Sequence, residues 1–256
     1  MSGLPPGAWA FYFAAIPAVV LLGLSKGGFS GLGTLAIPIL ALAISPVKAA
    51  AITLPLMVAQ DWVSVWAFRR DFDARNLLIM IPGSLVGIAA GWLLAARVNE
   101  DAVRLAVGLI SIGFVVFMLV RDRIAGDVAA TPHVAPGVFW GALSGFTSFV
   151  SHAGAPPFMV YVLPQKLSPR AFAGTSTIFF ATVNLLKVPP YFILGQFSAD
   201  NLFASATLFP VAIVATFAGV WLVRRVSAER FYNAVLLLTF LIGVKLTYDA
   251  LHELLV

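Results

Sequence analysis

Only 11% of the 256 residues are charged and 61% are hydrophobic, which excludes an ordinary soluble domain, where about 25% of residues are charged. The formal net charge of +5 does not indicate nucleic-acid binding, because the basic residues fall in short loops, as the positive-inside rule describes. The chain has no cysteine, which excludes disulfides, thiolate metal ligands and a thiol nucleophile. The composition therefore predicts an all-α, polytopic integral membrane protein.

The first half of the chain begins with two short apolar runs on either side of a glycine-rich break. The runs cover residues 9–24 and 34–44, and the break covers residues 23–33. A membrane span needs about 20 apolar residues, so the two runs form either half-helices or tilted, kinked spans. Longer apolar segments follow at 49–68, 76–96 and 103–120, before a polar linker at 121–135.

The second half repeats this order. An apolar run at 136–150 leads into a second polar break at 144–154, and the next run, 155–163, is too short to span alone. Three long segments complete the half, at 170–194, 201–223 and 230–251.

Matching features recur in the same order in both halves. Ser45-Pro46 corresponds to Ser168-Pro169 at an offset of 123, and Asn76-Leu77 corresponds to Asn201-Leu202 at an offset of 125. The offset only grows along the chain, as loop insertions in a duplicated unit would produce. The alternative is that small residues and prolines recur in all membrane helices. The duplication predicts a first transmembrane repeat at 1–120, a cytoplasmic linker at 121–135 and a second repeat at 136–256.

Loop charges predict how the two repeats are oriented. If each half has five segments, of which the first two form a hairpin, ten Lys and Arg residues fall on one side and three on the other. If each hairpin instead counts as one crossing, the halves are parallel, and eight Lys and Arg residues fall on one side and five on the other. The positive-inside rule favours the first arrangement, an inverted repeat in the inner membrane with both termini outside. The number of basic residues on each side is the same whether the two segments of a hairpin cross the membrane fully or form a re-entrant loop. The ten are Arg69, Arg70, Arg75, Arg121, Arg123, Lys166, Arg170, Arg224, Arg225 and Arg230.

The two breaks also resemble a known family. The stretch from Gly23 to Gly33, followed by Pro38 and Ser45-Pro46, resembles the first-half motif of the sulfite exporter TauE/SafE family. The stretch from Gly141 to Pro157, followed by Gly174-Thr175-Ser176, resembles the looser motif of that family's second repeat. The resemblance covers nearly the whole chain. It implies an inner-membrane carrier that moves sulfite, sulfonates or related sulfur-containing organic anions, usually outward.

An anion inside a low-dielectric protein needs fixed hydrogen-bond donors. A helix N-terminus supplies unpaired N–H groups and a partial positive charge, and glycines let such groups approach closely. Transporters built on inverted repeats commonly aim half-helix ends at the substrate near the midplane. The alternative is close helix packing through small residues, which needs no ligand. The expected substrate site joins the two breaks and comprises Lys26, Gly27, Gly28, Ser30, Gly31, Gly33, Ser148, Ser151, His152, Gly154, Thr175 and Ser176.

Several of these residues also fit a structural role. Lys26 either adds positive charge to the site or extends to the cytoplasmic edge of the membrane. His152 either donates to an oxyanion, carries a coupling proton or bonds a backbone carbonyl as a structural histidine. The hydroxyls of Thr175, Ser176 and Thr177 either reach the anion or bond carbonyls of their own helix.

Three further polar residues lie deep in predicted segments. Charges inside a membrane are costly and usually functional, so Asp61, Asn184 and Lys187 are expected to serve in coupling or gating. Asp61 and Lys187 occupy nearby positions in the repeat and could pair, although inversion tends to place them toward opposite faces.

The leading hypothesis is a secondary carrier for small sulfur anions. An anion channel and a carrier for another organic anion are the alternatives, because paired broken helices occur in channels too. A membrane enzyme is disfavoured, since no histidine cluster or useful carboxylate pair is present, and no P-loop pattern indicates ATP hydrolysis. His133, His152 and His252 are widely spaced and match no metal motif. No cofactor or metal is expected, the partners are a small anion and the lipid bilayer, and the oligomeric state is left open.

Overall fold

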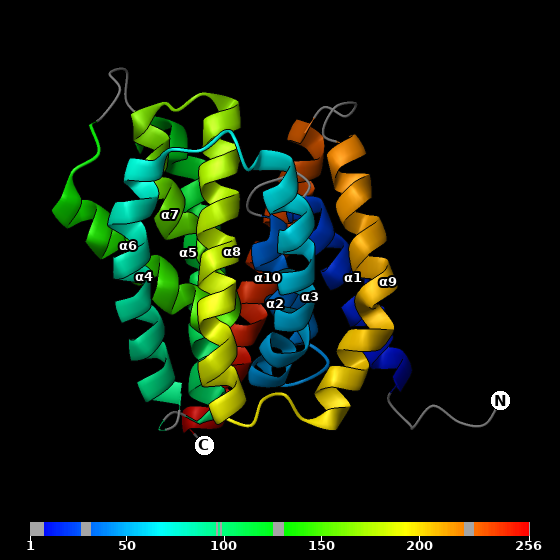
Figure 1. Cartoon of the computed structure of the whole chain (residues 1–256). Helices are drawn as coiled ribbons and strands as arrows, with labels where there is room; N and C mark the ends of the chain where they lie inside the picture. Colours follow the sequence, from blue (N-terminus) through cyan, green and yellow to red (C-terminus); the bar gives the residue numbers. More distant parts are fainter. Residues whose placement is uncertain are drawn as a thin grey trace.

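The computed structural model describes residues 8–26, 32–95, 97, 99–124, 131–222 and 228–255. Within these ranges the chain forms ten α-helices and two short 3-10 helices, with no strand (Figure 1). Seven of the described helices are long and apolar enough to cross a membrane. The prediction of an all-α, multi-pass membrane protein is therefore confirmed.

The first half contains one long helix, two short helical pieces and three more long helices. The short pieces follow the glycine break, where only nine described residues, Leu32–Leu40, are helical before the chain turns. The elements are α1 (Ala8–Lys26), η1 (Leu32–Leu35), α2 (Ala36–Leu40), α3 (Pro46–Phe68), α4 (Ala74–Ala95) and α5 (Glu100–Ile124).

The second half has the same order of long and short elements. Helix α5 continues to Ile124 and the next described helix begins at Val134, so both ends of the predicted linker at 121–135 overlap helices. The elements are α6 (Val134–Ser151), α7 (Ala155–Val162), η2 (Leu163–Gln165), α8 (Pro169–Ile193), α9 (Ala199–Leu222) and α10 (Ala228–Leu255).

The two Ser-Pro pairs begin equivalent helices. Ser45 Oγ accepts a hydrogen bond from the backbone N–H of Lys48 at 3.3 Å, and Ser168 Oγ accepts one from Ala171 at 3.3 Å. A proline follows each serine at the first helical position, where its missing N–H costs nothing. The motif seen twice in the sequence thus fixes where α3 and α8 start.

The packing of the helices is reciprocal between the halves. The most extensive contacts among the described residues join α4 to α6, α1 to α9 and α5 to α10, and α3 also packs on α8. Exchanging the halves maps α4–α6 onto α9–α1 and leaves α5–α10 and α3–α8 unchanged. In Figure 1, α3 and α8 run in opposite directions, as do α4 and α9. These observations support the predicted duplication with inverted topology.

Small residues permit the close crossing of α4 and α6. A Cβ added to Gly87 would lie 1.9 Å from the carbonyl oxygen of Ala142, and one added to Gly145 would lie 2.2 Å from that of Ser84. The backbones therefore touch directly, as small residues allow in membrane bundles.

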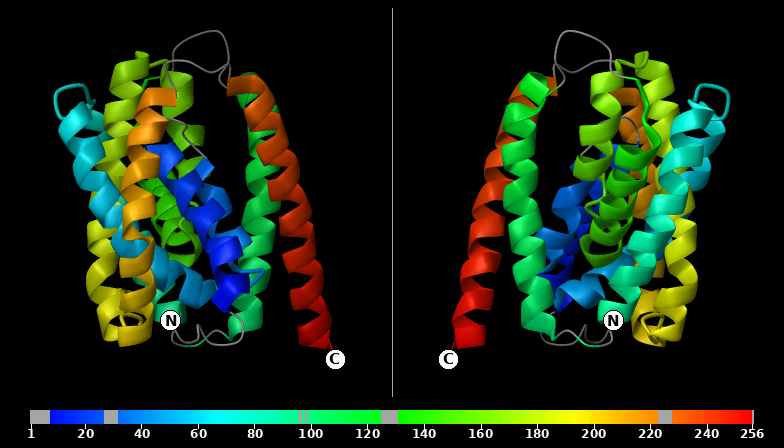
Figure 2. Two further views of the ribbon diagram at one scale, coloured as in Figure 1. Left: turned by 90° about the vertical axis from the view of Figure 1, so that its right-hand side faces the viewer. Right: turned by 90° about the vertical axis from the view of Figure 1, so that its left-hand side faces the viewer.

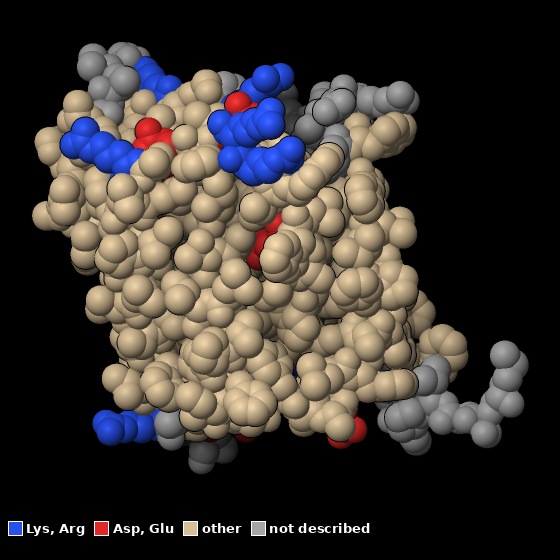
Figure 3. All heavy atoms as spheres, viewed as in Figure 1, with Lys and Arg blue, Asp and Glu red and all other residues tan. Residues whose placement is uncertain are grey.

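The two ends of the bundle differ in charge. We call the end at which α3 ends and α8 begins the linker end. Lys and Arg side chains gather at the linker end and are sparse at the other end (Figure 3). Figure 2 shows α5 and α10 side by side along one flank of the bundle.

Candidate functional site

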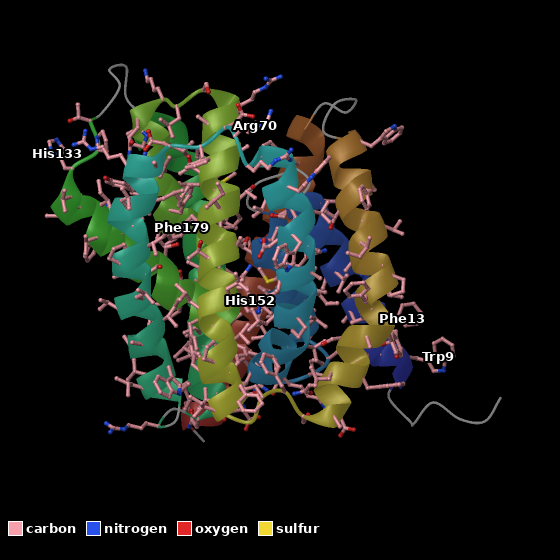
Figure 4. The ribbon with its side chains drawn as sticks, viewed as in Figure 1. Trp9, Phe13, Arg70, His133, His152 and Phe179 are labelled. Atoms are coloured by element: carbon pink, nitrogen blue, oxygen red, sulfur yellow. The ribbon has the colours of Figure 1, made fainter. Side chains whose placement is uncertain are left out.

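The second break stops α6 inside the bundle. His152 follows the last residue of α6 in the left-handed conformation, with φ of 54°, and its N–H donates to Ser148 O at 3.0 Å. Ala153 N–H donates to Thr147 O at 3.3 Å, so the last carbonyls of the helix are satisfied. Figure 4 places His133, before α6, near the linker end and His152 near mid-height. The chain therefore reverses at about the middle of the bundle.

Both nitrogens of the His152 ring are occupied by protein groups. Nε2 lies 3.1 Å from Ala50 O, and because a carbonyl only accepts, Nε2 carries the hydrogen. Nδ1 lies 2.8 Å from Lys187 Nζ and 3.1 Å from Ser148 O; with the hydrogen on Nε2, Nδ1 accepts from Lys187. The ring also stacks on Tyr191, with centroids 6.4 Å apart. His152 therefore bridges α3 and α8 and holds no free ring N–H for an anion.

Lys187 is fully buried, and neutral groups surround its ammonium. Nζ donates to Ser148 O at 3.1 Å, to Ser148 Oγ at 3.0 Å and to His152 Nδ1. These three acceptors match the three hydrogens of an ammonium group. The charge of Lys187 is thus stabilised by dipoles rather than by a carboxylate.

Lys26 forms a different kind of contact. Its ammonium pairs with Asp61 Oδ1, and Asn184 Nδ2 donates to Asp61 Oδ2 at 2.6 Å. The side chains of Lys26 and Asp61 are only 13% and 6% exposed. Ser64 Oγ donates to the backbone carbonyl of Lys26 at 3.2 Å, which fixes the end of α1 against α3. The pair therefore lies inside the protein rather than at the membrane surface.

Beside these residues lies a cavity of about 80 Å³, which we call the central cavity. Its wall includes Phe68 and Ala173, which lie toward the linker end of α3 and α8. Leu22, Met57, Met159 and Phe180 supply apolar surface. The polar side chains in the wall are Ser25, Lys26, Thr34, Ser148, His152, Ser176 and Thr177.

The structure gathers part of the predicted site. Lys26, Gly33, Ser148, His152 and Ser176 line the central cavity. Gly27, Gly28, Ser30 and Gly31 lie outside the described residues.

Three predicted residues have structural partners elsewhere. Ser151 Oγ donates to Thr147 O at 3.3 Å, and Gly154 O accepts from Ser144 Oγ at 2.7 Å. Thr175 Oγ1 donates to Ala171 O at 2.6 Å and accepts from Asp73 N–H at 2.8 Å, which ties α8 to the loop before α4.

Two other findings differ from what the sequence predicts. Asp61 pairs with Lys26, whereas Lys187 bonds Ser148 and His152, so the proposed Asp61–Lys187 pair does not form. Ser25 and Thr34 line the cavity but were not predicted as site residues. Ser25 lies within the glycine break and Thr34 directly follows it, so extending the site to every hydroxyl in or next to the break would have found them.

A second cavity, of about 170 Å³, lies toward the other end of the bundle, and we call it the far-side cavity. Val47 at the start of α3 and Leu94 at the end of α4 line it. Ala50, Phe149 and Tyr191 also line it, and Tyr191 OH donates to Phe149 O at 2.8 Å. The bond of His152 to Ala50 therefore joins the walls of the two cavities, and the bond of Tyr191 to Phe149 lies in the wall of the far-side cavity.

No group of three or more His, Asp or Glu side chains that could hold a metal occurs in the described ranges. The central cavity is lined by the ammonium of Lys26 and several hydroxyls, while Lys187 lies behind Ser148 and the carboxylate of Asp61 pairs with Lys26 outside the cavity wall. That set suits an anion held by charge and hydrogen bonds.

Comparison with known proteins agrees with this chemistry. No curated protein and no solved structure matches the chain. The family model described as "Sulfite exporter TauE/SafE" matches residues 15–246, nearly the whole chain. The family is one of membrane transporters, not of enzymes. By this match, the chain belongs to the sulfite exporter TauE/SafE family.

Proposed function

We propose that this protein is a secondary carrier that exports small sulfur oxyanions or organosulfonates across the inner membrane, with the anion bound in the central cavity. One observation carries the proposal. The ammonium of Lys26 lines the cavity, and the amino group of Lys187 lies behind Ser148 in the cavity wall, whereas Asp61 pairs with Lys26 but does not line the cavity. A cationic side chain in a low-dielectric interior favours a bound anion.

The cavity also offers hydrogen-bond donors. Ser148 Oγ accepts from Lys187, and no bond within the described residues uses its own hydrogen. Ala155, the first residue of α7, lines the cavity as well. Pro156 and Pro157 follow it and have no N–H, so this helix end supplies fewer donors than the dipole argument expects. Hydroxyls and ammonium groups therefore carry more of the binding.

The size of the central cavity suits a small ligand. Its volume of about 80 Å³ exceeds the roughly 10–15 Å³ that one water molecule requires. Met57, Met159 and Phe180 provide apolar surface on which the carbon part of an organosulfonate could pack. These features favour a small sulfonate or sulfite-like anion.

The separation of the two cavities favours a carrier over a channel. A carrier exposes its site to one side at a time, so a closed layer is expected on the other side of the site. The bonds of His152 and Tyr191 supply such a layer. In this conformation the site faces the linker end, which we assign to the cytoplasm because Lys and Arg gather there (Figure 3).

The test is thermal stabilisation of the purified protein by sulfite, thiosulfate, sulfoacetate, taurine, sulfate and acetate. A ligand that binds only the native state raises its apparent stability with the logarithm of concentration above Kd. Stabilisation by one sulfur anion, together with saturable exchange of that anion in proteoliposomes, is the expected result. Stabilisation by acetate alone would reject a sulfur substrate, and flux without saturation would reject a carrier.

The matched variants are Ser148→Ala and Thr207→Ala. Ser148 lines the cavity, whereas Thr207 Oγ1 lies outside it on α9 and donates to Ala204 O at 2.8 Å. We expect weaker ligand-induced stabilisation in Ser148→Ala and an unchanged effect in Thr207→Ala.

A further inference from the structure

The ion pair between Lys26 and Asp61 separates two cavities of different kinds. Lys26 lines the central cavity. Asp61 instead lines a groove of about 200 Å³ between α3 and α8, whose other walls are apolar apart from Thr182. Trp62 and Leu185 in this groove are 71% and 52% exposed on the outer surface of the bundle. The cation thus faces the polar site, and the acid faces the hydrocarbon of the bilayer.

The space-filling view agrees with this placement. Acidic atoms are visible at mid-height between α3 and α8 on a face that otherwise has no charged atoms at that depth (Figure 3). A carboxylate reached from the hydrocarbon is costly unless it is paired or neutral. In the structure the ammonium of Lys26 and the amide of Asn184 satisfy it.

We propose that an anion in the central cavity draws Lys26 away from Asp61 and that Asp61 then takes up one proton, so that anion and proton bind together. This inference rests on the proposed function. An anion beside Lys26 competes with Asp61 for the same ammonium. Once Lys26 turns to the anion, Asp61 is left without its cation beside an apolar groove, where an unpaired charge is costly.

The other titratable groups around the pair do not take over this role. Lys187 on α8 interacts electrostatically with both Lys26 and Asp61, and His152 after α6 lies within the field of Lys187 and Lys26. Both are fully engaged, however, since Lys187 donates all three hydrogens and both ring nitrogens of His152 have partners. Asp61 is therefore the group whose partner the anion removes.

Asn184 suits both protonation states of Asp61. Its NH₂ group donates to the carboxylate, while its own Oδ1 is buried and has no partner among the residues that the structure describes. Rotation of the amide would present Oδ1 to the hydroxyl of a protonated Asp61. A side chain that only donates or only accepts would serve one state alone.

The first test measures the binding of methanesulfonate against pH, because this anion does not itself titrate in the working range. If one proton binds with each anion, the apparent affinity rises about tenfold for each unit that the pH falls, wherever free Asp61 is ionised. Asp61→Asn, a neutral replacement of the same shape, is expected to bind with no such slope. A wild-type slope retained in Asp61→Asn would overturn the inference. Absence of binding at every pH would instead count against the proposed function.

The second test needs no substrate. Dicyclohexylcarbodiimide dissolves in the bilayer and reacts with protonated carboxyls: the carboxyl hydrogen moves to one nitrogen and the oxygen bonds to the central carbon. The resulting O-acylisourea rearranges to a stable N-acylurea, which mass spectrometry detects as the added mass of the whole reagent. In Lys26→Met, Asp61 has no cation beside it and should therefore react with the reagent several-fold faster than in wild type.

Controls separate Asp61 from the other acids. Asp61→Asn should lose the labelled peptide, and Asp200→Asn, at the start of α9, should keep it. Lys26→Arg keeps a positive charge beside Asp61 and should be labelled at the same rate as wild type. Labelling at the wild-type rate would also show that the fold tolerates a substitution at this position. Equal labelling of Lys26→Met and wild type, with both folded, would overturn the inference.

Discussion

At the scale of single residues, Lys187 differs from the other charged side chains of the interior. It is completely buried, yet its three hydrogens go to Ser148 and His152 and not to an acid. Neutral dipoles satisfy its hydrogen bonds but do not cancel its charge. The field of Lys187 therefore reaches the central cavity through Ser148, which lies in the cavity wall.

Replacement of Lys187 by methionine tests that field. Methionine has a similar length, and replacing a buried charge by an apolar side chain is often neutral for stability. We expect the fold to survive and anion affinity to fall about tenfold or more, equal to about 1.4 kcal/mol. Ligand-induced thermal shifts give the affinity. Lys245→Met is the control, because Lys245 pairs with Asp249 on the exposed side of α10 and should leave affinity unchanged.

Substitutions of His152 test whether the backbone at the second break is strained. A residue other than glycine in the left-handed region costs roughly 1–2 kcal/mol, and the ring contacts of His152 offset this cost. His152→Asn, which tolerates this conformation, should be more stable than His152→Ala, since alanine keeps the strain and loses every ring contact. Both variants should show weaker anion binding, because Lys187 loses an acceptor. Unfolding temperatures rank the variants, and equal values would show that the backbone conformation is not strained.

At the scale of elements, each broken hairpin packs on a helix of the opposite half. In α4–α6 the contact runs through Gly87 and Gly145, and in α1–α9 it runs through Gly23, whose added Cβ would lie 2.5 Å from the Cβ of Ala215. Neither crossing tolerates a larger side chain without moving the helices. The positions of the breaks therefore depend on small residues far from the site.

A pair of glycine substitutions measures this dependence. Gly87→Ala should lower the unfolding temperature markedly, because the new methyl group meets a backbone carbonyl that cannot rotate away. Gly113→Ala in α5 meets nothing within 4 Å and should be neutral or stabilising by up to about 1 kcal/mol, from helix propensity alone. Equal effects of the two changes would show that the crossing is not tightly packed.

At the scale of the whole molecule, the absence of cysteine makes the two cavities separately measurable. A single cysteine at Ser176 would report on the central cavity, and one at Ala106 on the far-side cavity. A small, membrane-impermeant thiosulfonate reagent should label Ser176→Cys from the linker side and Ala106→Cys from the opposite side. Labelling of both from the same side would contradict the closed layer at His152 and Tyr191.

The sequence predicts the elements better than their contacts. Apolar segment lengths and the Ser-Pro pairs locate the helices, because membrane spanning and capping are local requirements. The partners of Lys26 and Lys187 could not be predicted, since they depend on the rotation of each helix about its axis and on crossings between the halves. Both residues were expected to matter, but the only partner considered for Asp61 was Lys187, whereas Asp61 pairs with Lys26.

The site was predicted only in part for a related reason. Polar residues at a break indicate a cavity, but the break does not show which hydroxyls point into it. Ser151 and Thr175 bond carbonyls of their own helices, an alternative that any serine or threonine in a helix offers. Ser25 and Thr34, by contrast, line the central cavity. The sequence alone does not distinguish hydroxyls that point into the cavity from hydroxyls that bond a carbonyl of their own helix.

The reciprocal packing has a consequence for biogenesis. α1 packs on α9 and α6 packs on α4, so the first hairpin meets its main partner only after most of the chain has been synthesised. Until then, Lys26 at the end of α1 has its ion-pair partner, Asp61 on α3, within the same half. α6, by contrast, finds α4 already inserted. During synthesis, the packing partner of the second hairpin is therefore already present when that hairpin emerges, whereas the partner of the first hairpin is not. The two halves, although similar in structure, therefore assemble in different ways.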